Sequence, residues 1–141
     1  MAEFSITHSF AAAPERVFDA WLDPAIARRF LFATPTGEMI RAEVDPKVGG
    51  KFTFVDRRPD MGDVLHTGEY LELDRPRRLA FTFGVPAFNP DFSKILLQFA
   101  PTPGGGCQLT LTQSDVPAEW AERSKDGWGM ILGGLERALA S

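Results

Sequence analysis

The sequence predicts an α+β fold in which a curved antiparallel sheet of about six or seven strands wraps around a long C-terminal helix, with two short helices after the first strand. Three observations support this prediction. Short segments alternate apolar with polar residues, glycine- and proline-rich turns separate these segments, and an apolar repeat of helical spacing ends the chain. Because 141 residues suit one domain of ordinary size, we expect residues 1–141 to fold as a single domain.

The first strand and the two short helices are expected at the start of the chain. Apolar or aromatic side chains alternate with serine and threonine over residues 4–10, which is typical of a strand with one buried face. Pro14 begins a pattern of helical spacing, since proline is well tolerated in a first helical turn. Asp23 followed by Pro24 has the form of an N-cap and a first helical residue, so we expect the second helix to end near Phe30.

Six further strand segments follow, and their apolar residues fall in phase with one another. Threonine and glutamine occupy many of the alternate positions, so one face of the sheet is expected to be buried and the other exposed. Short connections between consecutive segments favour an antiparallel meander over parallel βαβ units. The expected strands are Glu38–Asp45, Lys51–Arg57, Val64–Leu73, Arg78–Gly84, Phe92–Pro101 and Cys107–Ser114. The longest irregular stretch, Val85–Asp91, is interpreted either as a flap at the mouth of a pocket or as a long hairpin turn.

The last helix is predicted after Pro117, following an irregularity expected around Ser124–Gly127. Its apolar residues recur at helical spacing. They are Trp128, Ile131, Leu132, Leu135 and Leu139. Glycines at positions 129, 133 and 134 each cost about 1 kcal/mol relative to alanine inside a helix. Two explanations stay open: these glycines leave side-chain volume for a cavity, or they let the helix pack closely against its neighbours.

Composition excludes several classes of protein. No apolar run is long enough to span a bilayer, and the first residues lack the features of a signal peptide, so we expect a cytoplasmic protein. The single Cys107 cannot form an internal disulfide, which agrees with a reducing compartment. A net charge of −4 and a pI near 5.1 argue against a nucleic-acid partner.

Arginines nevertheless cluster near the expected turns. The clusters are Arg28-Arg29, Arg57-Arg58 and Arg75 with Arg77-Arg78. A solvated charge is the ordinary occupant of a turn, and an anion-binding rim is the alternative interpretation.

No pattern in the chain is typical of a metal, nucleotide or nucleophile site. The two histidines, His8 and His66, lie on strands far apart in sequence, and no phosphate-binding glycine loop or nucleophile elbow occurs. We therefore expect no metal and no cofactor, and we assign no catalytic residue. An enzyme stays open as an alternative, because a buried histidine such as His66 can act as an acid or base.

Four segments carry a family resemblance, which spans nearly the whole chain. They are Ala13–Trp21, Asp45–Phe52, Pro76–Phe83 and Gly127-Trp128. They combine a proline-started helix, a double-glycine turn feeding a strand, a strand with inward apolar side chains and a helix anchored by tryptophan. In order and spacing they resemble the START-like, or SRPBCC, helix-grip (START/Bet v-like) superfamily, and within it the bacterial single-domain relatives of the activator of the heat-shock protein 90 ATPase.

The resemblance implies a cavity between the sheet and the C-terminal helix that binds a hydrophobic ligand or partner. We expect a small lipophilic ligand, while a cyclase- or isomerase-like enzyme and a chaperone-associated interaction module stay open. A chaperone or a second copy of the chain is the alternative partner, and no residue selects a stress role. Two positions depart from the resemblance: Phe30 stands where relatives often carry tryptophan, and Gln113 stands where many carry histidine.

Eleven side chains are the candidate ligand-binding residues. The expected apolar walls are Phe30, Phe32, Phe52, Phe54, Phe81, Phe83, Trp128 and Leu132. The residues expected to orient the polar end of the ligand are His66, Tyr70 and Gln113. Such an apolar pocket with few polar groups is the usual form of a small-molecule site. The alternative is that the phenylalanines simply fill the core.

Overall fold

The computed structural model describes residues 2–31, 37–60, 62–86 and 92–140, and of Ala140 it describes only the backbone. Phe32 and most of the stretch Val85–Asp91 lie outside these residues. The elements in chain order are β1 (Ala2–Phe10), α1 (Pro14–Ala20), α2 (Pro24–Phe30), β2 (Glu38–Val44), β3 (Lys51–Arg58), β4 (Gly62–Asp74), β5 (Arg78–Phe83), β6 (Ser93–Thr102), β7 (Gly106–Val116), the 3-10 turn η1 (Ala118–Trp120) and α3 (Ala121–Ala140).

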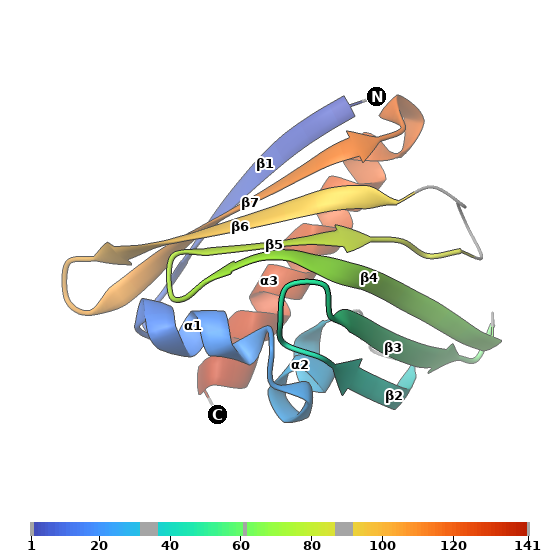
Figure 1. Ribbon diagram of the computed structural model, residues 1–141, viewed down its shortest axis with the longest axis horizontal. Helices are drawn as coiled ribbons and strands as arrows, with labels where there is room; N and C mark the ends of the chain where they lie inside the picture. The colour runs from blue at the N-terminus through green and yellow to red at the C-terminus, as the bar shows by residue number, and fades with distance from the viewer. Residues whose placement is uncertain (1, 32–36, 61, 87–91, 141) are drawn as a thin grey trace.

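The described strands form one seven-stranded antiparallel sheet in the order β1-β7-β6-β5-β4-β3-β2 (Figure 1). Strands β2 to β7 each pair with their neighbours in sequence, which confirms the predicted meander. The first strand joins the far edge by pairing with the last, so that Phe4 lies opposite Gln113 and Phe10 opposite Cys107. The two ends of the sheet therefore hold β1 and β2, and the long helix α3 crosses the face between them.

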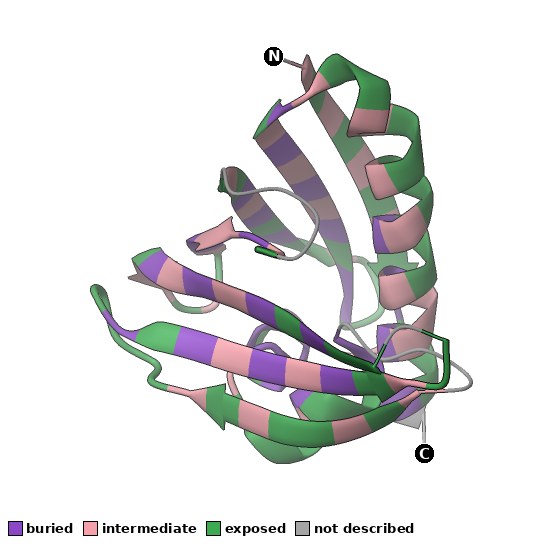
Figure 2. Ribbon diagram, turned by 90° about the vertical axis from the view of Figure 1, so that its right-hand side faces the viewer, coloured by how far each residue is buried: buried purple, intermediate pink, exposed green. Residues whose placement is uncertain are grey.

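Burial alternates along the strands, as predicted from the alternation of apolar and polar residues. On β3, Phe52, Phe54 and Asp56 are buried, while their neighbours face outward or are half-buried. A similar alternation is visible along β1, β4, β6 and β7 (Figure 2), whereas β5 buries three consecutive residues, Leu79, Ala80 and Phe81. One face of the sheet is thus covered, and its apolar side chains join those of the helices in one core cluster.

The two short helices begin where their prolines predict. Pro14 is the first residue of α1, and Pro24 is the first residue of α2. The carboxylate of Asp23 accepts a hydrogen bond from the backbone N–H of Ala25 at 3.0 Å, which satisfies one of the free donors at the start of α2. Both helices bury residues in the core, and α2 packs against α3.

Helix α3 covers the concave side of the sheet and is continuous over Ala121–Ala140. The irregularity expected around Ser124–Gly127 was therefore wrong: the chain departs from the α-helix earlier, in η1 at Ala118–Trp120. The buried residues of α3 include Trp128, Leu132 and Leu135, as the spacing predicted. Within the described part of the chain, no helix has the length and apolarity needed to cross a membrane.

The glycines of α3 have different surroundings. A Cβ atom at Gly134 would lie 3.4 Å from Cβ of Phe30, so this glycine allows α2 and α3 to approach closely. A Cβ atom at Gly127 or Gly129 would meet nothing within 4 Å. At Gly133 it would meet only the guanidinium of Arg137, at 3.7 Å. Close packing therefore explains Gly134, whereas open space surrounds Gly127 and Gly129.

Candidate functional site

An open groove of about 1500 Å³ lies alongside α3 and is lined by residues of α2, α3, β1, β3, β4, β5 and η1. Its apolar surface comes from seven side chains of β1, α2, β5, η1 and α3. They are Ile6, Phe30, Phe83, Trp120, Trp128, Met130 and Ile131. Figure 2 shows α3, which supplies many of the lining residues, beside the curved sheet.

Four of the predicted ligand-binding residues meet in this groove: Phe30 from α2, His66 from β4, Phe83 from β5 and Trp128 from α3. The rings of His66 and Phe83 are stacked, with centroids 6.3 Å apart and planes inclined by 15°. The ring of Phe83 in turn meets Trp128 edge to face at 5.4 Å. These contacts form a continuous aromatic wall from β4 through β5 to α3.

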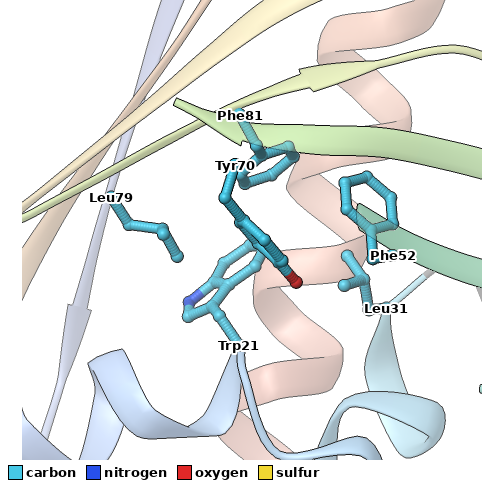
Figure 3. A pocket seen from close by; sticks show the side chains of 6 residues that line it. All are labelled: Trp21, Leu31, Phe52, Tyr70, Leu79 and Phe81. Carbon is cyan, nitrogen blue, oxygen red and sulfur yellow. The ribbon is translucent and has the colours of Figure 1, made fainter. Parts of the chain in front are cut away.

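Three other predicted residues lie in the core instead. Phe52, Tyr70 and Phe81 surround a small void together with Trp21, Leu31 and Leu79 (Figure 3). The void holds about 10 Å³, the space of a single water molecule. Burial raises the pKa of the Tyr70 hydroxyl, with a smaller contribution from Asp45. These side chains fill the core around the void and leave no room there for a ligand.

The remaining predicted residues are distributed differently. Phe54 and Leu132 are fully buried in the core, and neither belongs to the surface of the groove. Phe32 lies outside the described residues. Gln113 is buried on β7, and its side-chain oxygen accepts a hydrogen bond from the indole N–H of Trp128 at 3.0 Å. The amide of Gln113 therefore positions Trp128, which itself lines the groove.

A polar cluster lies at one end of the groove, on β3 and β4. The Asp56 side chain is fully buried, and Nε of Arg58 donates a hydrogen bond to its Oδ2 at 2.9 Å. His66 lies opposite Phe54, two residues from Asp56 on β3, and is close enough to the pair for both charges to act on it. Burial, and then the positive charge of Arg58, lower the pKa of His66 to about 4. At neutral pH the imidazole is therefore uncharged.

Other chemistry finds little support among the described residues. They contain no group of three or more histidine, cysteine, aspartate or glutamate side chains that could hold a metal ion. Cys107 is fully buried, and burial raises the pKa of its thiol, which disfavours the reactive thiolate. The groove surface thus combines apolar and aromatic side chains with the polar cluster of β3 and β4 and several charged side chains.

The family model for "Activator of Hsp90 ATPase homolog 1-like protein" matches residues 11–140. The chain belongs to this family. The resemblance inferred from the four sequence segments is thereby confirmed, and so is the α+β helix-grip fold. No curated protein sequence matches the chain significantly.

Solved structures of similar proteins cover almost all of the chain. An Activator of Hsp90 ATPase homolog 1-like protein from Aeromonas hydrophila is 26% identical, with 99% of this chain and 92% of that chain covered and a TM-score of 0.84. An HSP90 activator from Plasmodium falciparum is 28% identical, with 99% and 97% covered and a TM-score of 0.77. A protein from Chromobacterium violaceum, 24% identical with 97% and 96% covered and a TM-score of 0.83, shares the fold.

The cationic rim of the groove is the main feature that the sequence did not settle. Arg29 and Arg58 belong to the arginine clusters for which a solvated role and an anion-binding role both stayed open, and both residues line the groove. The other cations on its surface are Arg123, Lys125 and Arg137, all from α3. No sequence signal marked these three, because only the folded position of α3 brings them beside the arginines of α2 and β3.

Proposed function

We propose that this family member binds a small lipophilic molecule in the groove beside α3. The observation that carries the proposal is an open groove of about 1500 Å³ whose apolar side chains come from β1, α2, β5, η1 and α3. Ligand sites are typically concave and mostly apolar, with a few polar groups that orient the ligand. Here Phe83 and Trp128 provide the aromatic surface, and Arg58 with His66 provides the polar end.

The physical basis is the removal of apolar surface from water. Each CH₂ group that a ligand buries contributes about 0.8 kcal/mol, so a chain of eight to ten carbons contributes enough to offset the entropy lost on binding. The aromatic wall is fixed by the hydrogen bond from Trp128 to Gln113. A wall that is already ordered loses little side-chain freedom when a ligand binds, which favours affinity.

The proposal is tested with the neutral lipophilic probe N-phenyl-1-naphthylamine, whose fluorescence rises in apolar surroundings. We expect saturable binding at about one probe per chain. Gly127→Leu places a side chain into open space on the groove surface and should strongly reduce this binding. Ala25→Leu, on the exposed side of α2 and outside the groove, is the matched control and should bind normally. Absence of saturable binding, or equal binding by both variants, would contradict the proposal.

Activation of an Hsp90 ATPase is the second candidate function. Its support is the Plasmodium falciparum protein, an HSP90 activator that is 28% identical over nearly the full length of both chains. The test is the ATPase rate of a purified Hsp90 with and without an excess of this protein. A saturable rise in rate would favour this function, whereas an unchanged rate and no complex in sedimentation would exclude it for that chaperone.

Acid-base catalysis by His66 has weaker support. The imidazole does lie in the groove and is only 5% exposed. With a pKa of about 4, however, His66 is a weak base at neutral pH, whereas an efficient general base has a pKa near the working pH. A neutral imidazole in this position is better suited to donate or accept one hydrogen bond from a bound ligand. We propose the cytoplasm as the compartment, consistent with a single buried cysteine.

A further inference from the structure

We propose that the ligand of the groove is a lipophilic anion of the carboxylate class, with its head group at Arg58 and its apolar chain along Phe83 and Trp128. This inference rests on the proposed function and adds the charge of the ligand to it. It follows from three properties of the groove: the imbalance of charge on its surface, the availability of its cations, and the position of Arg58 at the end of the aromatic wall.

The groove surface carries an excess of positive charge, whereas the whole protein carries a net negative charge. The chain has 15 lysines and arginines against 19 aspartates and glutamates. Five of those cations line the groove, whereas the described acidic residues contribute only Asp126 to its surface. An acidic protein thus presents an excess of positive charge along this apolar groove. Such an excess of charge raises the local concentration of anions and repels cations.

Three of these cations are available to a ligand. Arg123, Lys125 and Arg137 are exposed on α3, and none of them forms an ion pair with a carboxylate of the described residues. The guanidinium of Arg123 lies over the ring of Trp120 at 5.1 Å from its centroid, so it borders apolar surface directly. Their positions at the rim suit attraction of an anion, and they remain accessible to water.

Arg58 is placed to contact the head group itself. Its side chain is only 20% exposed, and Asp56 holds it through Nε at 2.9 Å. That bond uses one of the five N–H donors of the guanidinium, so its terminal nitrogens remain available for a carboxylate. His66 is uncharged beside it and can add a neutral hydrogen bond. A charged donor at the end of an apolar wall matches a molecule with one anionic end.

The experiment compares three ligands with the same ten-carbon chain: decanoate, decanol and decylammonium. Each is titrated against protein carrying N-phenyl-1-naphthylamine, and displacement of the probe is measured. We expect decanoate to displace the probe about tenfold better than decanol, as charge-assisted hydrogen bonds allow, and decylammonium to be the weakest. Added NaCl should reduce the advantage of decanoate.

The outcomes separate the inference from the proposed function. Displacement by decanol equal to or better than displacement by decanoate would overturn the inference and leave the groove as a site for neutral lipophiles. Strongest displacement by decylammonium would overturn it as well. If the probe does not bind at all, both the proposed function and the inference fail.

Variants test the assignment of Arg58. Asp56→Asn/Arg58→Gln removes the pair without changing net charge or leaving one partner unpaired, and it should abolish most of the preference for decanoate. Arg57→Gln is the matched control, because Arg57 is exposed and pairs with Asp63 outside the groove, and it should keep the preference. A double variant that keeps the preference would overturn the role of Arg58.

If the double variant does not fold, the exposed cations give an independent test. Arg123→Gln/Lys125→Gln/Arg137→Gln removes three charges from the rim without breaking an ion pair with any described residue. We expect this triple variant to bind decanoate several-fold more weakly and to bind decanol as the unmodified protein does. An unchanged ratio between the two ligands would contradict the anionic preference.

Discussion

The indole N–H of Trp128 donates a hydrogen bond to the side-chain oxygen of Gln113 at 3.0 Å, and both residues are buried. This bond connects α3 to β7 across the interior of the helix-grip fold. Trp128 lines the groove, while Gln113 lies behind it. The wall of the candidate site therefore depends on a polar contact in the core.

Loss of this acceptor should destabilise the protein. Gln113→Met keeps the side-chain volume but leaves the buried N–H of Trp128 without its partner, which costs about 1–3 kcal/mol. Gln98→Met, on the exposed positions of β6, is the control and should change the free energy of unfolding by less than about 0.5 kcal/mol. Urea unfolding followed by circular dichroism measures both. Equal unfolding midpoints for the two variants would show that the bond contributes nothing.

His66 should make the stability of the protein depend on pH between about 4 and 6.5. Its pKa in the folded protein is about 4, below the ordinary value of 6.5, because burial disfavours the charged imidazole. Between these values the unfolded chain binds more protons than the folded protein, so stability falls as pH falls through this window. Once the pH lies below both pKa values, the free energy of unfolding has fallen by about 3 kcal/mol. Above pH 6.5 this group contributes no pH dependence.

The measurement is urea unfolding at a series of pH values. His66→Gln should flatten the loss of stability between pH 6.5 and 4, whereas His8→Gln, in which His66 is the remaining histidine, should retain it. If the free energy of unfolding of His66→Gln still falls between pH 6.5 and 4 as in the unmodified protein, other groups cause the acid sensitivity.

Breaking the buried ion pair of β3 should be far more damaging than breaking the exposed pair next to it. Arg58→Gln leaves the fully buried Asp56 without its guanidinium partner, which costs about 3 kcal/mol. Arg57→Gln removes the exposed pair with Asp63 and should leave the unfolding midpoint almost unchanged. The double variant Asp56→Asn/Arg58→Gln should recover most of the loss. Similar midpoints for Arg57→Gln and Arg58→Gln would contradict this description of the pair.

Gly68 and Gly129 should respond to alanine in opposite directions. A Cβ atom at Gly68 would collide with the backbone oxygen of Thr82 and would lie 2.6 Å from Cε2 of Phe52, so Gly68→Ala should destabilise by about 2–3 kcal/mol. At Gly129 it would meet nothing within 4 Å, so Gly129→Ala should stabilise α3 by about 1 kcal/mol. Thermal unfolding of both variants tests this contrast. A stable Gly68→Ala protein would mean that β5 approaches β4 less closely than described.

The fold was predictable because its signals are local. Alternation along the strands, glycine-rich turns and the prolines at 14 and 24 each act within a few residues, and the strands and helices form where these patterns predict. The start of α3 was harder to predict from the sequence, because polar residues and Gly127 weaken the helical pattern over its first turns. Its N-terminal part is nevertheless continuous with the apolar repeat that follows.

The site was only partly predictable, because it depends on how distant elements meet. Alternation shows that Phe52, Phe81 and Phe83 point to the same side of the sheet, but not which of them reaches the groove. The position of α3 decides this: Phe83 meets Trp128 in the groove, whereas Phe52 and Phe81 lie around the small core void. The bond between Gln113 and Trp128 likewise joins two elements, and no local pattern indicates it.

A crystal structure of the protein with decanoate that carries bromine on its terminal carbon would test ligand binding in the groove most directly. Anomalous scattering locates the bromine, and the difference density locates the chain and the carboxylate. We expect bromine beside Trp128 and Phe83, with the carboxylate at Arg58. Bromine found only outside the groove, or a groove without ligand in crystals from saturated solution, would show that this binding mode is wrong.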